Sequence, residues 1–180
     1  MIITTKNKKA VSFRRLTGTD YDKLIHYLLQ LSPETKNRFA PHSFDKGAVS
    51  HFYQTNPFNH GYIAEDIGDG SIVAYAVIRL GYLEHDADRL RSFGFVPDHF
   101  TDVTYAPSVA DQWQGLGIGY HLLQFIEEEL KIIGRQRVIL WGGVQQENEK
   151  AVQYYLKNSF ITLGEFEYNG LNYDMVKTIG

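Results

Sequence analysis

Apolar residues recur at helical spacing in two long segments of the chain. In the segment after Thr19 they occupy positions 24, 25, 28, 29 and 31, which predicts an amphipathic helix capped by Thr19. In the segment 117–133 the inward-facing residues are expected to be Leu122, Leu123, Phe125, Ile126 and Leu130. The run from Glu127 to Glu129 is predicted to face solvent, and Gly134 is predicted to end the helix.

Shorter helices are expected elsewhere. Ser32 as a cap, Pro33 at the first helical position and Glu34 in the first turn predict a helix that runs to about Phe39. Further helical segments are expected at 45–53, at 84–91, where the pattern is weak, and at 150–157.

Strands are predicted where apolar residues alternate or run continuously. The expected strands are residues 11–16, 62–65, 71–80, 102–109, 138–144, 160–168 and 171–179. Pro107 interrupts the fourth of these, and Trp141 is expected in the core because it lies in a continuous apolar run. Turns are expected at Gly68–Gly70 and at Asn169-Gly170, the strongest hairpin signal in the chain.

The order of these elements predicts an α/β (α+β) fold. One strand and two helices are followed by three strands, then by a helix, a strand and a helix, and finally by a hairpin. This order favours a mixed, mainly antiparallel, twisted sheet with helices on both faces. The sequence shows no internal repeat or linker, so a single domain over residues 1–180 is expected.

Composition narrows the function classes. The chain has 180 residues, of which 43% are hydrophobic, and it has no cysteine, which excludes thiol catalysis and cysteine-ligated zinc. The net charge of −3 and the lack of a long basic run argue against nucleic acid as a partner. No apolar run approaches the ~20 residues that span a bilayer, and the N-terminal sequence lacks a signal-peptide pattern. We therefore expect no membrane partner and a cytoplasmic protein. The seven histidines show no metal-ligand spacing, so no metal is expected.

A glycine-rich turn carries the clearest chemical signal. It follows the strand that ends at Val109 and precedes the long helix, and it contains Gly115, Gly117 and Gly119. Glycines let the backbone approach a ligand closely, and the amides at the head of a helix can cradle a phosphate without a lysine. No Lys-Ser/Thr pair follows, so it is not a Walker loop. A tight corner with no ligand is the structural alternative.

The segment Gln114-x-x-Gly117-x-Gly119 resembles the Q/R-x-x-G-x-G/A signature of the GNAT superfamily of N-acetyltransferases. The resemblance implies that this turn binds the pyrophosphate of acetyl-CoA. It also implies that the preceding strand splays apart from its neighbour and binds the pantetheine arm, in agreement with a proline that cannot donate to a ladder. The implied cofactor-binding residues are Pro107, Ser108, Val109, Gln114, Gly115, Leu116, Gly117, Ile118, Gly119 and Tyr120.

A second segment adds to the resemblance. Residues 148–160 resemble the family pattern N-x-x-A-x-x-x-Y-x-x-x-G-F, which places Asn148 near the cofactor and makes Tyr155 the implied general acid for the leaving thiolate. Tyr154 is the alternative if the helix phase differs by one residue. Ser159 stands where the family has glycine, a departure that is expected to affect the helix end rather than the chemistry. The resemblance covers residues 102–179 well, whereas residues 1–100 carry no motif.

The resemblance implies direct attack of an amine on the thioester, with a backbone amide near Val109 polarising the carbonyl. The general base stays open. Some relatives carry a glutamate near the position of Thr104, and the alternatives in this chain are Asp102, Glu65, His60 and His99. Asp111 is expected to cap the turn, and Trp113 is expected to pack against it.

The sequence leaves two questions of function open and disfavours a third possibility. The leading hypothesis is acetyl transfer to a primary amine of a small molecule, peptide or protein, and the alternative is a domain that senses acyl-CoA without turnover. A dinucleotide-binding enzyme is disfavoured, since Arg135–Trp141 holds no acidic residue for a ribose. The segment 81–100 is either a lid over the acceptor or a contact with a second subunit in a homodimer.

Overall fold

The computed structural model describes residues 1–39 and 41–180. The chain forms two compact units, each built from two stretches of sequence. The first unit comprises residues 1–78 and 106–128, and the second comprises residues 79–105 and 129–180. Strands β4 (Ile72–Leu80) and β5 (Asp102–Val109) and helix α5 (Ile118–Ile132) contribute residues to both units, which are described in turn.

The first unit contains a run of neighbouring strands in one sheet. Its strands follow the order β1 (Ile2–Thr4), β2 (Ala10–Arg15), β3 (Asn59–Asp66), β4 and β5. β1 was not expected from the sequence, because its three residues are too few to show an alternating pattern; it pairs with β2, with Ile3 opposite Val11. The β2–β3 register places Phe13 opposite Ala64.

Helices lie on both faces of this part of the sheet. Tyr62 of β3 packs against Phe125 of α5, with ring centroids 6.3 Å apart. The preceding residue, Gly61, faces Leu16 and the Tyr53 hydroxyl of α3 (Lys46–Gln54). Successive residues of a strand point to opposite faces, so α5 and α3 cover opposite sides of β3, as the sequence predicts.

The entry to α1 (Tyr21–Gln30) differs from the prediction. A short 3₁₀ turn, Gly18–Asp20, precedes the helix, so the capping hydrogen bonds lie two residues before Thr19. The backbone amide of Thr17 donates to the Asp20 carboxylate over 2.9 Å, and the Thr17 hydroxyl donates to it over 2.8 Å. Arg14 donates to both oxygens of the same carboxylate at 2.7 Å. Thr19 is therefore not the cap, because the chain turns more tightly than an α-helix there.

The other helices of the first unit follow the prediction closely. α2 (Pro33–Arg38) is capped by the Ser32 hydroxyl, which accepts from the Thr35 amide. α3 is capped by Asp45. Along α5, the buried side chains are Ile118, Leu122, Leu123, Ile126 and Leu130. Phe125 and Glu127 are half-buried and Glu128 is exposed, so only part of the acidic run faces solvent as expected.

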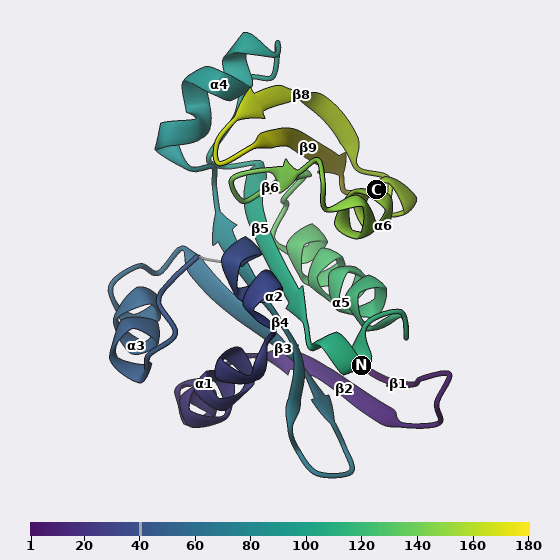
Figure 1. Cartoon of the computed structure of the whole chain (residues 1–180). Coiled ribbons are helices and arrows are strands. Elements are labelled where there is room, and N and C mark those ends of the chain that lie inside the picture. Colours follow the sequence, from purple (N-terminus) through teal and green to yellow (C-terminus); the bar gives the residue numbers. More distant parts are fainter. Residues whose placement is uncertain (40) are drawn as a thin grey trace. The chain divides into compact units, whose positions relative to one another are not determined.

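The second unit is built around a C-terminal hairpin, drawn in yellow in Figure 1. Its strands follow the order β5, β6 (Arg137–Leu140), β9 (Leu171–Thr178) and β7 (Val144–Gln145), and β8 (Ile161–Glu167) also pairs with β9. β5 and β6 are parallel, from Asp102 opposite Arg137 to Tyr105 opposite Leu140. The remaining pairs are antiparallel.

The predicted strand 138–144 is wrong in its extent. β6 ends at Leu140, and Gly142 and Gly143 follow with φ of 65° and 73°. These left-handed conformations are incompatible with a straight strand. Trp141 consequently lies in the turn and is half-exposed, not in the core.

Two ion pairs and one apolar cluster hold the second unit together. The cluster comprises Tyr82, Ala87, Leu90, Phe95, Ile139 and Val176, with Leu163 packed against it. It joins α4 (Ala87–Ser92) to the hairpin, and the two elements lie side by side in Figure 1. Arg137 donates to Asp102 over 2.6 Å and Arg89 donates to Asp174 over 2.6 Å. With α6 (Glu149–Lys157), these elements complete the mixed, mainly antiparallel fold with flanking helices that the sequence predicts.

Candidate active site

The glycine turn of the first unit opens onto free space. Gly115 and Gly117 have φ of 76° and 84°, a region that residues with a Cβ atom rarely adopt. A Cβ atom added to Gly115 would meet no other atom within 4 Å, and one on Gly117 would meet only Cδ2 of His121, at 3.8 Å. The left-handed backbone accounts for glycine at these two positions, and the space beside them is open.

The head of α5 supplies donors toward that space. A backbone hydrogen bond at this end runs from the His121 amide to the Gly117 carbonyl over 3.1 Å. The first turn of a helix has no carbonyl one turn earlier to accept from its amides. The first turn, Ile118–His121, contains no acidic residue, so the positive end of the helix dipole is not offset there. This donor set suits a pyrophosphate.

Hydrogen bonds of the Asp111 and Gln114 side chains hold the glycine turn in place. The Asp111 carboxylate accepts from the Ser32 amide, the Ser32 hydroxyl and the Thr35 hydroxyl at 3.0–3.1 Å. Burial by itself raises the pKa of Asp111, but these hydrogen bonds outweigh it and lower the pKa. The prediction that Asp111 caps the turn is therefore wrong, because its carboxylate ties the turn to the start of α2. Gln114 donates to the Val109 carbonyl over 3.1 Å.

The predicted pantetheine strand is anchored within the same unit. Ser108 is buried; its hydroxyl lies 3.0 Å from the Tyr27 hydroxyl and donates to the Tyr75 carbonyl over 3.3 Å. The Ala110 amide donates to the Val73 carbonyl over 2.9 Å. The structure therefore places the implied residues from Pro107 to Tyr120 in one contiguous piece of the first unit. Trp113 is buried, as expected, with Nζ of Lys9 over its ring at 4.7 Å.

The other implied site residues belong to the second unit. The Asn148 side chain caps α6 by accepting from the Ala151 amide over 3.3 Å. Tyr155 is 8% exposed, and its ring packs against Tyr154 and Phe160 with centroids 5.2 Å away. Burial raises the pKa of Tyr155, so its hydroxyl keeps its proton at neutral pH. Ser159 has a φ of 66°, so the helix end does adopt the conformation for which glycine is suited.

The sequence model of the acetyltransferase (GNAT) family matches residues 25–160. The chain belongs to this family. No curated protein is similar enough in sequence to match the chain.

Solved structures resemble it in fold. The GNAT domain of S. lividans PAT has a TM-score of 0.77 and 18% identity, with 99% of this chain and 96% of that chain covered. The ribosomal-protein-S5-alanine acetyltransferase from Vibrio fischeri has a TM-score of 0.71 and 13% identity, with 94% and 93% covered. A spermidine N-acetyltransferase chimera, SpeG K23-Q34 from Vibrio cholerae and hSSAT, has a TM-score of 0.66 and 17% identity, with 93% and 95% covered. These neighbours support the GNAT fold.

The candidate general bases of this GNAT chain form hydrogen bonds or ion pairs with other groups, and so does Thr104, which stands where some relatives carry a glutamate. Thr104 is buried and donates to the Gly81 carbonyl over 2.9 Å. Asp102 is fully buried in its ion pair with Arg137. Glu65 pairs with Arg14 at 2.7 Å.

The two histidines considered for the same role are also engaged. His99 lies 2.7 Å from the Glu84 carboxylate and stacks on Tyr82. Nε2 of His60 lies 3.2 Å from the Pro57 carbonyl.

A hydrogen-bonded group that the sequence did not reveal lies in the first unit. Nε2 of His42 lies 2.7 Å from the Tyr75 hydroxyl, which is also hydrogen-bonded to the Tyr53 hydroxyl. In the sequence, Tyr53 follows His42 by 11 positions and Tyr75 follows Tyr53 by 22 positions. No motif or spacing connects them, so only the fold could bring them together.

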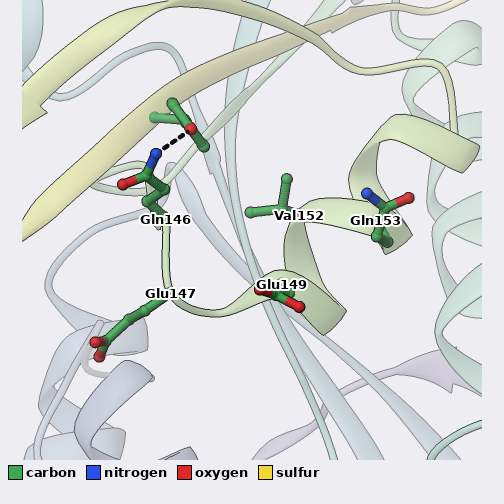
Figure 2. A pocket seen from close by; sticks show the side chains of 6 residues that line it. Gln146, Glu147, Glu149, Val152 and Gln153 are labelled. Carbon is green, nitrogen blue, oxygen red and sulfur yellow. Dashed lines mark hydrogen bonds between the residues drawn. The ribbon is translucent and has the colours of Figure 1, made fainter.

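Each unit contains a hollow. One, of about 440 Å³, is lined by Gln146, Glu147, Glu149, Val152, Gln153 and Tyr173 of the second unit. Figure 2 shows Gln146 and Glu147 on the segment before α6, and Glu149, Val152 and Gln153 on the helix. Its two carboxylates would repel a pyrophosphate, so the glycine turn fits the cofactor better. The other, of about 210 Å³, lies in the first unit and includes Tyr53.

Within the described ranges, 1–39 and 41–180, no helix is long and apolar enough to cross a membrane. The same residues contain no group of three or more histidine, aspartate or glutamate side chains placed to hold a metal ion.

Proposed function

We propose that this GNAT protein transfers an acetyl group from acetyl-CoA to a primary amine of a small molecule, peptide or protein by direct attack. One observation carries the proposal: the open glycine turn at the head of α5, with left-handed glycines and no acidic residue in the first helical turn. That arrangement suits a pyrophosphate, and family membership makes acetyl-CoA the expected donor. The proposal treats residues 1–180 as one domain, because the family match extends over both units.

Backbone groups do most of the binding in this proposal. The segment from Gln114 to Tyr120 holds the pyrophosphate through amides, and the strand from Pro107 to Val109 holds the pantetheine arm. Acetyl-CoA, when bound, supplies the thioester whose carbonyl an amide near Val109 polarises. The hydrogen bonds from Ser32 to Asp111 and from Gln114 to Val109 fix the turn before a ligand arrives. Prepositioned donors of this kind contribute to rate because they need no rearrangement during reaction.

Tyr155 is proposed to return the proton to the departing thiolate. Its buried phenol keeps its proton at neutral pH, which a general acid requires. Asn148 is proposed to contact the cofactor in addition to capping α6. Tyr154, half-buried on the same helix, is the alternative acid.

A second candidate function is a GNAT-fold sensor that binds acyl-CoA without turnover. The observation that favours it is Thr104, which is buried and donates to the Gly81 carbonyl where some relatives carry a carboxylate. A sensor needs the glycine turn but neither an acid nor a base.

The deciding experiment combines binding with turnover. Calorimetry measures acetyl-CoA and CoA binding, and thiol release is then followed with a panel of spermidine, a peptide with N-terminal alanine and a lysine peptide. The first two amines are those named for two of the structural neighbours, the spermidine and the S5-alanine acetyltransferases. Binding with turnover supports the enzyme, binding without turnover on any amine supports the sensor, and no binding excludes both.

Within the same assay, Tyr155→Phe is expected to lower kcat about 100-fold while acetyl-CoA affinity changes little. Tyr154→Phe, on the adjacent residue, is the matched control and is expected to keep kcat within about threefold. The reverse ranking would assign the acid to Tyr154.

A further inference from the structure

Three side chains of the first unit form a directed chain of hydrogen bonds. Nδ1 of His42 lies 3.0 Å from the Ser43 carbonyl. A carbonyl can only accept, so Nδ1 carries the hydrogen of the neutral ring and Nε2 is the acceptor. The Tyr75 hydroxyl, 2.7 Å away, therefore donates to Nε2. The Tyr53 hydroxyl in turn donates to Tyr75.

The chain of hydrogen bonds has one accessible end. Tyr75 is fully buried on β4, whereas Tyr53 is half-buried and lines the hollow of about 210 Å³. The lining residues of this hollow are Arg15, Leu16, Tyr21, Tyr53, Asn59, His60 and Gly61. Arg15 is the cation among them, and a nearby cation disfavours an ammonium ion and favours the loss of its proton. The Tyr53 oxygen donates its hydrogen inward, so its lone pairs can accept from a molecule in the hollow.

Tyr75 of this hydrogen-bonded group also contacts β5, the strand proposed to bind the pantetheine arm of the cofactor. The Tyr75 carbonyl accepts from the Ser108 hydroxyl over 3.3 Å. Ser108 lies in the segment proposed to bind the pantetheine arm. All of these contacts lie within the first unit.

We propose that a small primary amine binds in the Tyr53-lined hollow and that His42 is the terminal proton acceptor for it, reached through Tyr53 and Tyr75. This inference rests on the proposed acetyltransferase function and supplies the base that the carboxylates do not. Tyr53 contacts the amine, and Tyr75 and His42 act through it.

The proton balance of this relay is complete. An N–H bond of the ammonium breaks and its proton goes to the Tyr53 oxygen, while the Tyr53 proton goes to the Tyr75 oxygen and the Tyr75 proton goes to Nε2 of His42. The products are a neutral amine, two neutral phenols and an imidazolium. No phenolate forms, in keeping with burial that raises the pKa of both tyrosines.

The surroundings of His42 keep its ring neutral and able to accept a proton, and the same burial disfavours the imidazolium that forms. Its ring is packed among the aromatic rings of Phe39, Phe44 and Phe52, and burial lowers its pKa, so it is neutral at pH 7. The charged group that acts on it is the Asp45 carboxylate, which favours the imidazolium once the proton arrives. The other titratable neighbours are Tyr53 and Tyr75.

The test is the pH dependence of kcat/KM for His42→Gln against wild type, with the best amine of the panel. Glutamine cannot take up the proton, so a deficit of about 100-fold is expected at pH 7. The deficit should shrink to within about threefold near pH 10, where a primary amine loses its proton in solution. Tyr53→Phe and Tyr75→Phe should show the same recovery.

Controls separate this inference from a structural effect and from the proposed function. His51→Gln makes the same change at an exposed position on α3 and should match wild type at every pH. Acetyl-CoA affinity should be unchanged in all four variants, which also reports folding. A deficit that is constant over pH, or no deficit, overturns the relay alone, whereas a wild type that acetylates no amine overturns the proposed function. Nitrogen NMR of wild-type His42 should find the hydrogen on Nδ1, and a hydrogen on Nε2 would also overturn the relay.

Discussion

The glycine turn of the first unit and Gly143 of the second share a backbone conformation but not their surroundings. Gly115 and Gly117 have φ of 76° and 84°, and Gly142 and Gly143 have φ of 65° and 73°. A Cβ atom on Gly117 would stand in nearly open space, whereas one on Gly143 would lie 2.7 Å from the Tyr173 carbonyl and 2.8 Å from the Phe166 ring.

This difference in surroundings indicates two different reasons why a glycine occupies such a position. At Gly143 the chain packs against its own sheet, where β7 pairs with β9 and Val144 lies opposite Tyr173. Beside Gly117, the described residues of the first unit leave the equivalent space open, with Cδ2 of His121 at 3.8 Å. The first turn is thus left open, as the proposed cofactor site requires, whereas at Gly143 the chain packs against itself. The variants below test this contrast, from the largest expected effect to the smallest.

Gly117→Glu is expected to weaken acetyl-CoA binding about 100-fold or more, since it places a carboxylate where the pyrophosphate is proposed to bind. Calorimetry measures the effect, and circular dichroism checks the fold. Gly117→Ala introduces the backbone strain without the charge and should keep affinity within about tenfold. Equal losses in the two variants would show that the turn matters for its shape alone.

Gly143→Ala is expected to lower the free energy of unfolding by about 3 kcal/mol, because backbone strain and a clash with a carbonyl act together. Urea denaturation measures the change. Gly142→Ala is the matched control, because its φ is also left-handed but its Cβ would meet nothing within 4 Å; about 1 kcal/mol is expected there. The contrast between packed and open glycines fails if the two variants lose the same stability.

Ser159→Gly is expected to stabilise the protein by about 1 kcal/mol, because Ser159 already adopts a φ of 66° with a Cβ atom. Thermal denaturation should show a rise in Tm of a few degrees. A fall in Tm would show that the serine side chain contributes more than its backbone strain costs.

Asp111→Asn is expected to raise the Kd for acetyl-CoA only a few-fold, because it weakens the bonds that tie the turn to α2 without altering the turn. The lowered pKa of Asp111 means that its stabilising contribution is present above the unfolded-state pKa, near 3.9, and is lost as pH falls through the folded value. Unfolding free energy measured from pH 5 to pH 2 should therefore fall less in the variant than in wild type. Parallel pH curves would mean that the carboxylate does not stabilise the turn.

Much of the fold could be predicted because its signals are local. The cap at Ser32, the alternating and apolar runs and the Asn169-Gly170 turn each report on neighbouring residues, and each matches the structure. The predictions are wrong where the residues adjacent in sequence do not determine the local conformation. The strand through Trp141 was extended over two glycines, and the cap of α1 was assigned to Thr19 because the 3₁₀ turn was not foreseen.

The candidate site also has features that could be predicted from the sequence and features that could not. The sequence by itself determined the glycine turn, its place at the head of a long helix and the family resemblance, since all three depend on residues close together in the chain. Only the tertiary structure decided that Asp111 reaches Ser32, that Asp102 is buried against Arg137, and that His42 meets Tyr75 and Tyr53. Hydrogen bonds and ion pairs between distant segments depend on where the sheet and helices place their side chains. The residues adjacent to each side chain in the sequence do not determine that position.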